Sequence, residues 1–397
     1  MSRDLLTHNE PRASTITAAV FLAGLTAQTP FIAAGLLLID IAKTFQTTVG
    51  TMSQINTSSS ILAIFAALVM GALSVKYKHR SLLQIGLVTI AISAAGCYFA
   101  DNYLTMLIVF SLAGIGQSMV TPMTRTLVGE YIPRNKQPQA IGWLIAGSSL
   151  SYLVGAPLMA YLTNYGGWRT VFLIYLLPVA LLSLLVTQLA IPRKDDDYDP
   201  KPIQDVLQSF KTVLTDSSAL ACLLGSAFLG TSFQAVLVYS ASFYREVFSL
   251  PVSVVSNIVI VGALTFTAGS VGSSTVIGRF GKRPVIVVSS LLGALLIGLY
   301  TNTADFWVSM FSRVLGGFFV AIAYSGLNAM MLDQVPRFRG TVMSLNSAIG
   351  SLGSALGAFI GGMLLLVGGY AQVGFILGLF SVLCALIVYY RSKEIIE

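Results

Sequence analysis

The sequence predicts an all-α membrane protein of twelve transmembrane helices, built as two similar six-helix halves. Three observations predict this class. The 397 residues are 55% hydrophobic and 10% charged, whereas an ordinary soluble domain is roughly 25% charged. Apolar runs of about 20 residues, long enough to cross a hydrocarbon core, recur along the chain between short polar breaks. The second half also matches the first at one constant spacing of 203 residues.

Each apolar run is expected to be a helix, because an isolated strand cannot satisfy its backbone hydrogen bonds in lipid. In the first half the expected spans are 17–39, 53–75, 82–100, 104–129, 139–163 and 170–191. In the second half they are 217–240, 254–277, 284–302, 306–332, 340–366 and 371–390. The first span follows Arg3 and Arg12, but it is long and lacks a small-residue cleavage site, so we expect it to be retained.

The predicted domains are an N-terminal six-helix bundle at 1–191 and a C-terminal one at 217–397. Residues 192–216 between them form the one long polar break and are expected to be a cytoplasmic linker. Short cytoplasmic loops collect Lys and Arg, and with both termini inside these loops hold most of the cations. We therefore expect a multi-pass protein of the cell (inner) membrane with cytoplasmic termini. The asymmetry explains the net charge of +7, so it does not indicate a nucleic-acid partner.

The spacing of 203 residues brings loops and helix ends of the two halves into register. It lays Arg80 on Arg283, Pro133 on Pro336 and Glu130 on Asp333, among others. Because six helices return the chain to its starting side, the halves are expected to be parallel repeats about an axis along the membrane normal. Such architectures place the substrate site between the halves, near the midplane.

Several short patterns resemble the major facilitator superfamily, over essentially the whole chain. The loop after the second span, GALSVKYKHR at 71–80, and its repeat, STVIGRFGKR at 274–283, are similar to the charged loops of that family, although neither copy is complete. The turns that begin at Glu130 and Asp333 are similar to the family's turns after helices 4 and 10.

The resemblance implies gating and coupling roles for the charged residues of these loops. We expect Arg80 near Glu130 and Arg283 near Asp333, as cytoplasmic clusters that latch one access state; the alternative is that these cations only determine topology. The full set of expected gating or coupling residues is Asp40, Arg80, Glu130, Arg279, Arg283, Asp333 and Arg339.

Small residues in the fifth and eleventh spans are expected to pack helices closely. Gly147, Gly155 and Pro157 resemble a glycine–proline motif of the family's antiporters, and Gly353 and Gly357 continue a stripe of glycines in the eleventh span. The segment 167–169 also looks like the family's 12-helix efflux branch, which handles drugs and solutes.

Two arginines inside predicted spans are the sharpest clue to function, because burying a charge in lipid is costly. Arg313 lies eight residues past Asp305, hence about 12 Å into its helix. It serves either the transport cycle, by attracting substrate, or a structural contact with backbone carbonyls. Arg125 either extends to the cytoplasmic headgroups or lines the inward cavity opposite Asn328.

Polar and aromatic residues at mid-helix depth are the candidate substrate contacts. The set is Gln28, Phe31, Gln117, Arg125, Trp143, Gln234, Tyr239, Arg313, Tyr324 and Asn328. Together they suggest a pocket of modest charge for a neutral or amphipathic solute. Since no Asp, Glu or His lies near the middle of a span, a coupling proton would have to use Asp40, Glu130 or Asp333.

The sequence therefore predicts a secondary active transporter of small organic solutes that works by alternating access, as an efflux permease. Two alternatives stay open: a facilitator or symporter for a small organic anion, and, from another class, a membrane-embedded lipid-handling protein or enzyme. Motifs of soluble enzymes and metal-ligand spacings are absent. We expect no enzymatic activity, no metal and no cofactor, with the proton as the coupling ion to be tested, and a monomer in the bilayer whose partner is its small-molecule substrate.

Overall fold

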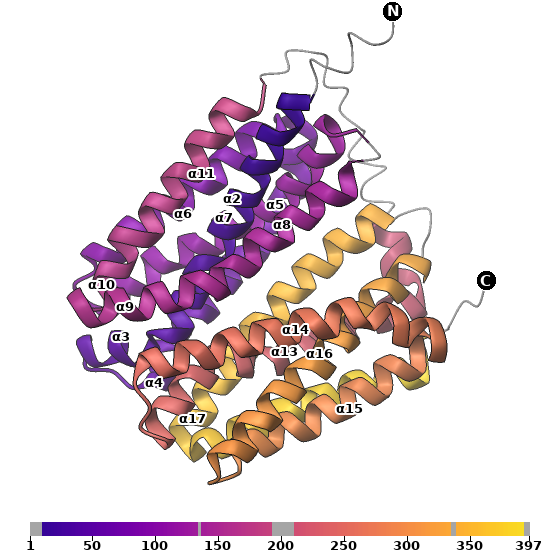
Figure 1. Ribbon diagram of the computed structural model, residues 1–397. Coiled ribbons are helices and arrows are strands. Elements are labelled where there is room, and N and C mark those ends of the chain that lie inside the picture. The colour runs from indigo at the N-terminus through magenta and orange to yellow at the C-terminus, as the bar shows by residue number, and fades with distance from the viewer. Residues whose placement is uncertain (1–9, 134–135, 193–209, 335–338, 393–397) are drawn as a thin grey trace, which may run out of the picture. The chain divides into compact units, whose positions relative to one another are not determined.

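The computed structural model describes residues 10–133, 136–192, 210–334 and 339–392 (Figure 1). The described residues form helices and loops, and contain no strand. Ten helices among them are long and apolar enough to cross a membrane. The predicted all-α membrane fold is confirmed.

In the first half, helices occupy all six predicted spans, and three of these spans are interrupted. The first contains α2 (Glu10–Leu36) and the beginning of α3 (Leu38–Thr44). The short helix α4 (Val49–Met52) precedes the second span, which is α5 (Gln54–Lys76). Then follow α6 (His79–Phe99) and α7 (Tyr103–Tyr131). The fifth span is α8 (Gln137–Leu150) and α9 (Ala156–Gly166), joined by the π-helix η1 (Ser151–Gly155); the sixth is α10 (Trp168–Val171) and α11 (Leu177–Ala190), joined by η2 (Phe172–Leu176).

In the second half the helices are longer, and one of them, α17, is interrupted. They are α13 (Ser217–Val247), α14 (Val252–Phe280), α15 (Lys282–Thr301), α16 (Phe306–Gln334) and α17 (Arg339–Arg391). Gly369 interrupts α17 with φ 69°, a backbone conformation that favours glycine. The chain turns there, so α17 supplies both the eleventh and the twelfth predicted spans.

The chain divides by its internal contacts into two units that do not coincide with the sequence halves. Unit 1 comprises Met1–Ala34 and Phe65–Pro200, and unit 2 comprises Gly35–Ile64 and Lys201–Glu397. The segment 35–64, which joins the first two predicted spans, therefore belongs with the C-terminal helices. Most of the predicted linker, 193–209, lies outside the described residues.

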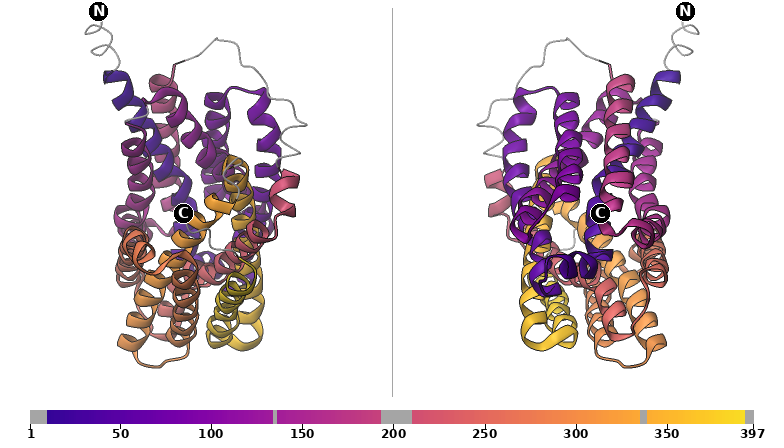
Figure 2. Two further views of the ribbon diagram at one scale, coloured as in Figure 1. Left: turned by 90° about the vertical axis from the view of Figure 1, so that its right-hand side faces the viewer. Right: turned by 90° about the vertical axis from the view of Figure 1, so that its left-hand side faces the viewer.

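Within each unit, long helices pack pairwise along their length. In unit 1, α6 packs against α7 and α11, and in unit 2, α13 packs against α17 while α15 packs against α16 (Figures 1 and 2). Glycines bring these backbones together: a Cβ on Gly353 would lie 2.5 Å from the carbonyl oxygen of Ala227, and one on Gly357 would lie 2.5 Å from that of Thr231. Side chains at these positions would force α13 and α17 apart.

Candidate functional site

A charged cluster closes one end of unit 1, where α6 begins and α7 and α11 end. His79 Nδ1 lies 2.5 Å from Glu130 Oε1. Arg80 Nη2 donates a hydrogen bond to the carbonyl oxygen of Gln188, at 2.7 Å. The last carbonyls of a helix have no partner inside the helix and carry partial negative charge, so the guanidinium stabilises the end of α11.

Unit 2 contains a second copy of this cluster at the repeat-related positions. Lys282 Nζ pairs with the Asp333 carboxylate, and Arg283 Nη2 donates to the carbonyl oxygen of Tyr389. The Arg283 guanidinium also lies over the Tyr389 ring, 5.3 Å from its centroid. His79 and Lys282, and Glu130 and Asp333, are each 203 residues apart.

In both copies the residue before the expected arginine contacts the acid. We expected Arg80 near Glu130 and Arg283 near Asp333; the ion pairs with these two acids that the structure describes are those of His79 and Lys282. Consecutive helix residues point about 100° apart, so the first residue of α6 or α15 faces the acid and the second faces the neighbouring helix end. Each cluster lies inside one unit and ties the ends of three helices together.

The other expected gating residues lie at helix ends. Arg279 is exposed in the last turn of α14, 5.5 Å from the centroid of the Phe280 ring. The side chain of Arg339 lies outside the described residues. Asp40, in α3, forms a two-pronged ion pair with Arg245 of α13.

Arg313 is enclosed within unit 2 and is 7% exposed. Its Nη1 donates to the carbonyl oxygen of Ile258 at 3.0 Å, and its Nη2 to Ser240 Oγ at 3.3 Å. A Cβ on Gly262 would lie 2.5 Å from Nη1. The guanidinium thus joins α16 to α13 and α14 and has the backbone-carbonyl contact that was one of its two predicted roles.

Asn328 of α16 stands at the end of a chain of buried hydrogen bonds. Ser226 Oγ donates to Asn346 Oδ1 at 2.7 Å, and Asn346 Nδ2 donates to Asn328 Oδ1 at 2.8 Å. Ser226 and Asn346 are buried, whereas Asn328 is half-buried. Because its oxygen is occupied, Asn328 presents its NH₂ group as the free end of the chain.

The remaining candidate substrate residues divide into packed and accessible side chains. Tyr239 is buried, with its hydroxyl 2.8 Å from Ser53 Oγ and 2.5 Å from the carbonyl oxygen of Ala358, and Phe31 packs edge to face on Phe110 at 6.0 Å. Gln234 is buried beside Gly357. The half-buried or exposed members are Gln28, Gln117, Arg125, Trp143 and Tyr324.

The predicted packing residues of the fifth span lie at close approaches within unit 1. A Cβ on Gly147 would lie 2.1 Å from the carbonyl oxygen of Phe21, and one on Gly155 would lie 2.8 Å from the Tyr175 hydroxyl. Pro157 stands in the first turn of α9, directly after η1, within a continuous helical stretch in which it has no N–H to donate to a preceding carbonyl.

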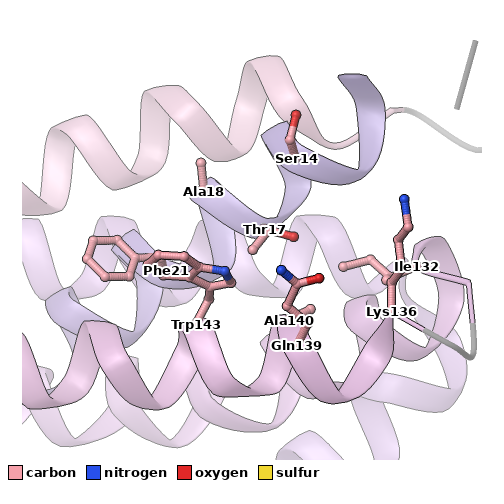
Figure 3. Close-up of a pocket in the computed structure, with 9 residues that line it drawn as sticks. All are labelled: Ser14, Thr17, Ala18, Phe21, Ile132, Lys136, Gln139, Ala140 and Trp143. Atoms are coloured by element: carbon pink, nitrogen blue, oxygen red, sulfur yellow. The ribbon is translucent and has the colours of Figure 1, made fainter. Parts of the chain in front are cut away.

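A pocket of about 550 Å³ opens between the first turns of α2 and α8 in unit 1 (Figure 3). Phe21 and Trp143 lie edge to face at one end of it, with ring centroids 5.9 Å apart. Thr17 of α2 and Gln139 of α8 line its middle, and Lys136 lies at the end away from the aromatic pair (Figure 3). The pocket combines an aromatic end with hydrogen-bonding groups and one cation.

Some residues that carry this geometry were not singled out from the sequence. His79 and Lys282 could have been found, because they obey the spacing of 203 residues and begin their helices. Arg245 is a further such residue, and no sequence signal links it to Asp40. No group of His, Cys, Asp and Glu side chains suited to a metal ion occurs among the described residues.

The family model described as Major Facilitator Superfamily matches residues 16–277 and 245–395. The chain belongs to this superfamily. The superfamily consists of transporters, so the chain is a transmembrane transporter and not an enzyme, and the predicted family, fold and class of function are confirmed.

Curated superfamily relatives cover most of the chain at low identity. A probable sugar efflux transporter of Pasteurella multocida is 26% identical over 356 residues, which is 87% of this chain and 84% of the relative. The uncharacterised MFS-type transporter YwfA of Bacillus subtilis is 22% identical, over 90% of this chain and 87% of the relative.

Solved superfamily structures share the fold over nearly the whole length. A D-xylose–proton symporter aligns with a TM-score of 0.81 at 16% identity, over 96% of this chain and 98% of that one. A bacterial homologue of the human lysosomal transporter Spinster, in an inward-facing and unoccupied conformation, aligns with a TM-score of 0.78 at 17% identity, over 96% and 97%.

Proposed function

We propose that the chain exports small neutral or amphipathic organic solutes, with sugars as the first class to test. Two curated relatives that cover most of the chain are named probable sugar efflux transporters, from Pasteurella multocida and Mannheimia succiniciproducens. The segment 167–169, which resembles the efflux branch, supports the same direction of transport.

The hydrogen-bonded chain that ends at Asn328 is the observation that carries the proposal. Sugars and other neutral solutes are recognised by fixed donors and acceptors, and an amide held by a second amide loses little rotamer freedom on binding. Asn328 offers two N–H donors in a fixed orientation, backed by the buried Asn346 and Ser226. A hydroxyl or carbonyl oxygen of the solute is the matching acceptor.

The pocket between α2 and α8 supports an amphipathic solute entering from the cytoplasm. Its aromatic pair, Phe21 and Trp143, suits an apolar ring face, and Thr17 and Gln139 supply polar contacts (Figure 3). The organic-anion alternative depended on Arg313 and Arg125. Since Arg313 donates to Ile258 and Ser240, we assign it to the scaffold of unit 2.

We further propose that the chain works as a monomer in the cell membrane, with both termini in the cytoplasm. The distribution of Lys and Arg supports this orientation. The coupling ion that we assign is the proton. The residues that carry it would be Asp40, Glu130 and Asp333. Each of them pairs with a basic side chain, which would compete with the proton for the carboxylate.

The experiment is transport by the purified protein in liposomes, with a panel of labelled neutral sugars and a fluorescent amphipathic dye. We expect accumulation of at least one neutral solute above protein-free vesicles, driven by an outward proton gradient from an acidic lumen, because an exporter coupled to protons exchanges the two. The Asn346→Leu variant should raise the concentration needed for half-maximal transport by about tenfold, since it releases the amide of Asn328. Asn257→Ala, at an exposed asparagine of α14, is the matched control.

One outcome would overturn the proposed solute class, and another would overturn the proposed coupling ion. Transport restricted to organic anions, abolished by Arg125→Ala and indifferent to Asn346→Leu, would establish the anion alternative. Transport of a neutral solute that does not respond to the proton gradient would remove the coupling ion and leave the solute class standing.

A further inference from the structure

Arg313 is a buried cation whose charge the described residues of unit 2 do not neutralise. Two of its nitrogens donate to neutral acceptors, Nη1 to the carbonyl oxygen of Ile258 and Nη2 to Ser240 Oγ. Its Nε is buried and has no hydrogen-bond partner among the described residues, and it forms no ion pair with an acid that the structure describes. Neutral acceptors satisfy hydrogen bonds but leave the positive charge uncompensated, which is costly inside a membrane protein.

The described acids on the neighbouring helix ends are exposed and have other partners. Glu246 of α13 accepts a hydrogen bond from the Tyr370 hydroxyl at 2.8 Å. Asp305 accepts one from a backbone N–H in the first turn of α16, at 2.9 Å. Asp305 comes eight residues before Arg313, which is about 12 Å along the helix. The carboxylates of these two acids therefore do not serve as the counter-ion of Arg313.

Two hydrogen bonds between α13 and α16 place Tyr244 beside Arg313. Ser240 and Tyr244 lie one helical turn apart on α13, and Ser309 and Arg313 lie one turn apart on α16. Arg313 donates to Ser240, and the Tyr244 hydroxyl lies 3.0 Å from Ser309 Oγ. The four side chains thus form one polar strip along the contact between the two helices.

Tyr300 of α15 brings a second unpartnered donor to this polar strip. Its backbone carbonyl oxygen accepts a hydrogen bond from Ser309 Oγ at 2.8 Å. The side chain is fully buried, and its hydroxyl has no hydrogen-bond partner among the described residues. This hydroxyl lies within electrostatic range of the Arg313 guanidinium. Two buried donors without acceptors and one uncompensated positive charge therefore lie in the same region of unit 2.

The surroundings of the polar strip are closed to large ligands. The serine and tyrosine residues that form it are at most 2% exposed. A Cβ on Gly262 would lie 2.5 Å from Arg313 Nη1, so α14 lies directly against the guanidinium. On α13, Phe243 packs edge to face on Tyr300, with ring centroids 5.5 Å apart. Such a site suits a small inorganic ion and excludes an organic solute.

The first half of the chain has no equivalent of these donors. The positions 203 residues before Arg313 and Tyr300 hold Phe110 and Cys97, which are both buried. The buried cation therefore belongs to the second half alone, unlike the helix-end clusters, which occur in both halves. A need for a counter-ion at this depth arises in unit 2 and not at the equivalent place in unit 1.

We infer that Arg313 and Tyr300 bind a small inorganic anion inside unit 2, with chloride as the first candidate. The anion accepts hydrogen bonds from Arg313 Nε and from the Tyr300 hydroxyl, and its charge neutralises the guanidinium. A water molecule accepts the same hydrogen bonds but leaves the charge in place. The bound anion joins α15 to α16 and adds to the contacts that Arg313 makes with α13 and α14. The inference does not depend on which solute is transported.

The test uses the purified full-length protein in detergent, with chloride replacing gluconate, a much larger anion, at constant ionic strength. A ligand that binds the folded state raises the unfolding temperature as its concentration rises. We therefore expect the midpoint of thermal unfolding to increase with chloride. Equilibrium dialysis against radioactive chloride should show one bound ion per chain.

Removing either donor should weaken chloride binding. Arg313→Met removes the positive charge and should abolish it. Tyr300→Phe removes one hydroxyl donor and should raise the chloride concentration needed for half-maximal binding by about tenfold. Because this hydroxyl has no described protein partner, Tyr300→Phe should unfold at the temperature of the parent in gluconate. This second variant keeps the test decisive even when Arg313→Met does not fold.

A matched control comes from an arginine of unit 1. Arg169 donates to the carbonyl oxygen of Ala100 at 2.6 Å and lies over the Trp168 ring, 4.7 Å from its centroid. Arg169→Met also removes an arginine that is bound to a backbone carbonyl, and it should leave chloride binding unchanged. Benzoate, added as an organic competitor, should not displace chloride from the enclosed site.

Each contrary outcome decides a separate point. Equal unfolding midpoints in chloride and gluconate, with no bound chloride, would overturn the anion. Chloride binding that persists in Arg313→Met would overturn the site. Displacement of chloride by benzoate would overturn the inorganic ligand. Chloride binding without transport of any neutral solute would overturn the proposed function and leave this inference standing.

Discussion

The helices α7 and α16 occupy equivalent places in the two halves, and they agree at their ends while they differ in their middles. At the ends, Glu130 and Asp333 each face the first residue of the preceding helix in the repeat. In the middles, Phe110 corresponds to Arg313. Phe110 is fully buried against Phe31, while Arg313 is bonded to α13 and α14.

The difference shows which parts of a duplicated transporter are constrained in common. The helix ends have the same task in both units, which is to hold three helices together at one side of the membrane. The middle parts of α7 and α16 contact different neighbouring side chains. The hydrogen bonds between helices at this depth can therefore differ between the two halves. An arginine in the hydrocarbon region is tolerated where hydroxyl and carbonyl oxygens surround it.

The largest effect on folding stability is expected when an arginine is placed in the first half at the position that corresponds to Arg313. Phe110→Arg buries a guanidinium where the described neighbour is an aromatic ring, and should cost about 3–5 kcal/mol of folding free energy. We expect little monodisperse protein on size-exclusion chromatography in detergent, whereas Phe110→Leu should remain well folded. A stable Phe110→Arg protein would mean that unit 1 also offers a polar partner at this depth.

The next effect comes from the space that Arg313 requires. Gly262→Ala places a methyl group 2.5 Å from Arg313 Nη1 and should cost about 1–3 kcal/mol. Thermal unfolding in detergent should show a lowered midpoint for Gly262→Ala. The double variant Gly262→Ala with Arg313→Met should lose less stability than the sum of the losses in the two single variants. Strictly additive losses would show that the added methyl group does not clash with the Arg313 side chain.

The two charged clusters should also differ in how their contribution to stability depends on pH, although this effect is smaller. Histidine side chains lose their charge near neutral pH, whereas lysine stays charged. Glu130 pairs with His79, whereas Asp333 pairs with Lys282. Both pairs are partly exposed, so each contributes about 1 kcal/mol or less.

The measurement compares thermal unfolding midpoints of Glu130→Gln and Asp333→Asn at pH 5.5 and pH 8. We expect Glu130→Gln to lower the midpoint more at the acidic pH, and Asp333→Asn to lower it equally at both. His79→Lys should abolish the difference. An equal pH dependence in both clusters would assign it to other groups.

The smallest effect is expected at the two arginines that bind helix ends. Arg80→Gln and Arg283→Gln each remove a cation from the last carbonyls of α11 or α17, worth about 0.5–1 kcal/mol. Because the two contacts are equivalent, their unfolding midpoints should fall by similar amounts. A clearly larger loss for one of them would show that the clusters are unequal in strength as well as in pH response.

Most of the fold could be predicted from the sequence, because the bilayer forces apolar runs of a fixed length into helices. The spans and the repeat followed from composition and spacing. The breaks at Leu37 and at η1 could not be predicted, since they depend on tertiary contacts such as that of Gly35 with α13.

The candidate site was predicted in part. Residue type and depth placed Arg313, Asn328 and the helix-end acids among the polar groups of the membrane helices. Their partners were not predictable. Every residue has a backbone carbonyl, so the sequence does not indicate that the carbonyl of Ile258 is the one that accepts from Arg313. The residue that faces Glu130 depends on which residue begins α6, and helix boundaries are the least certain feature of a sequence pattern.

The glycine contacts between α13 and α17 bear on how this transporter could change its substrate. Where a backbone carbonyl lies 2.5 Å from the place of a missing methyl group, as at Gly353 and Gly357, no larger residue can be sampled without moving a helix. Under the proposed function, variation in substrate range would come from side chains that do not hold two backbones together, such as Asn328, Gln139 and Trp143. In a mutant library that keeps the glycines fixed and randomises those positions, most variants should fold, and the variants should differ mainly in substrate binding.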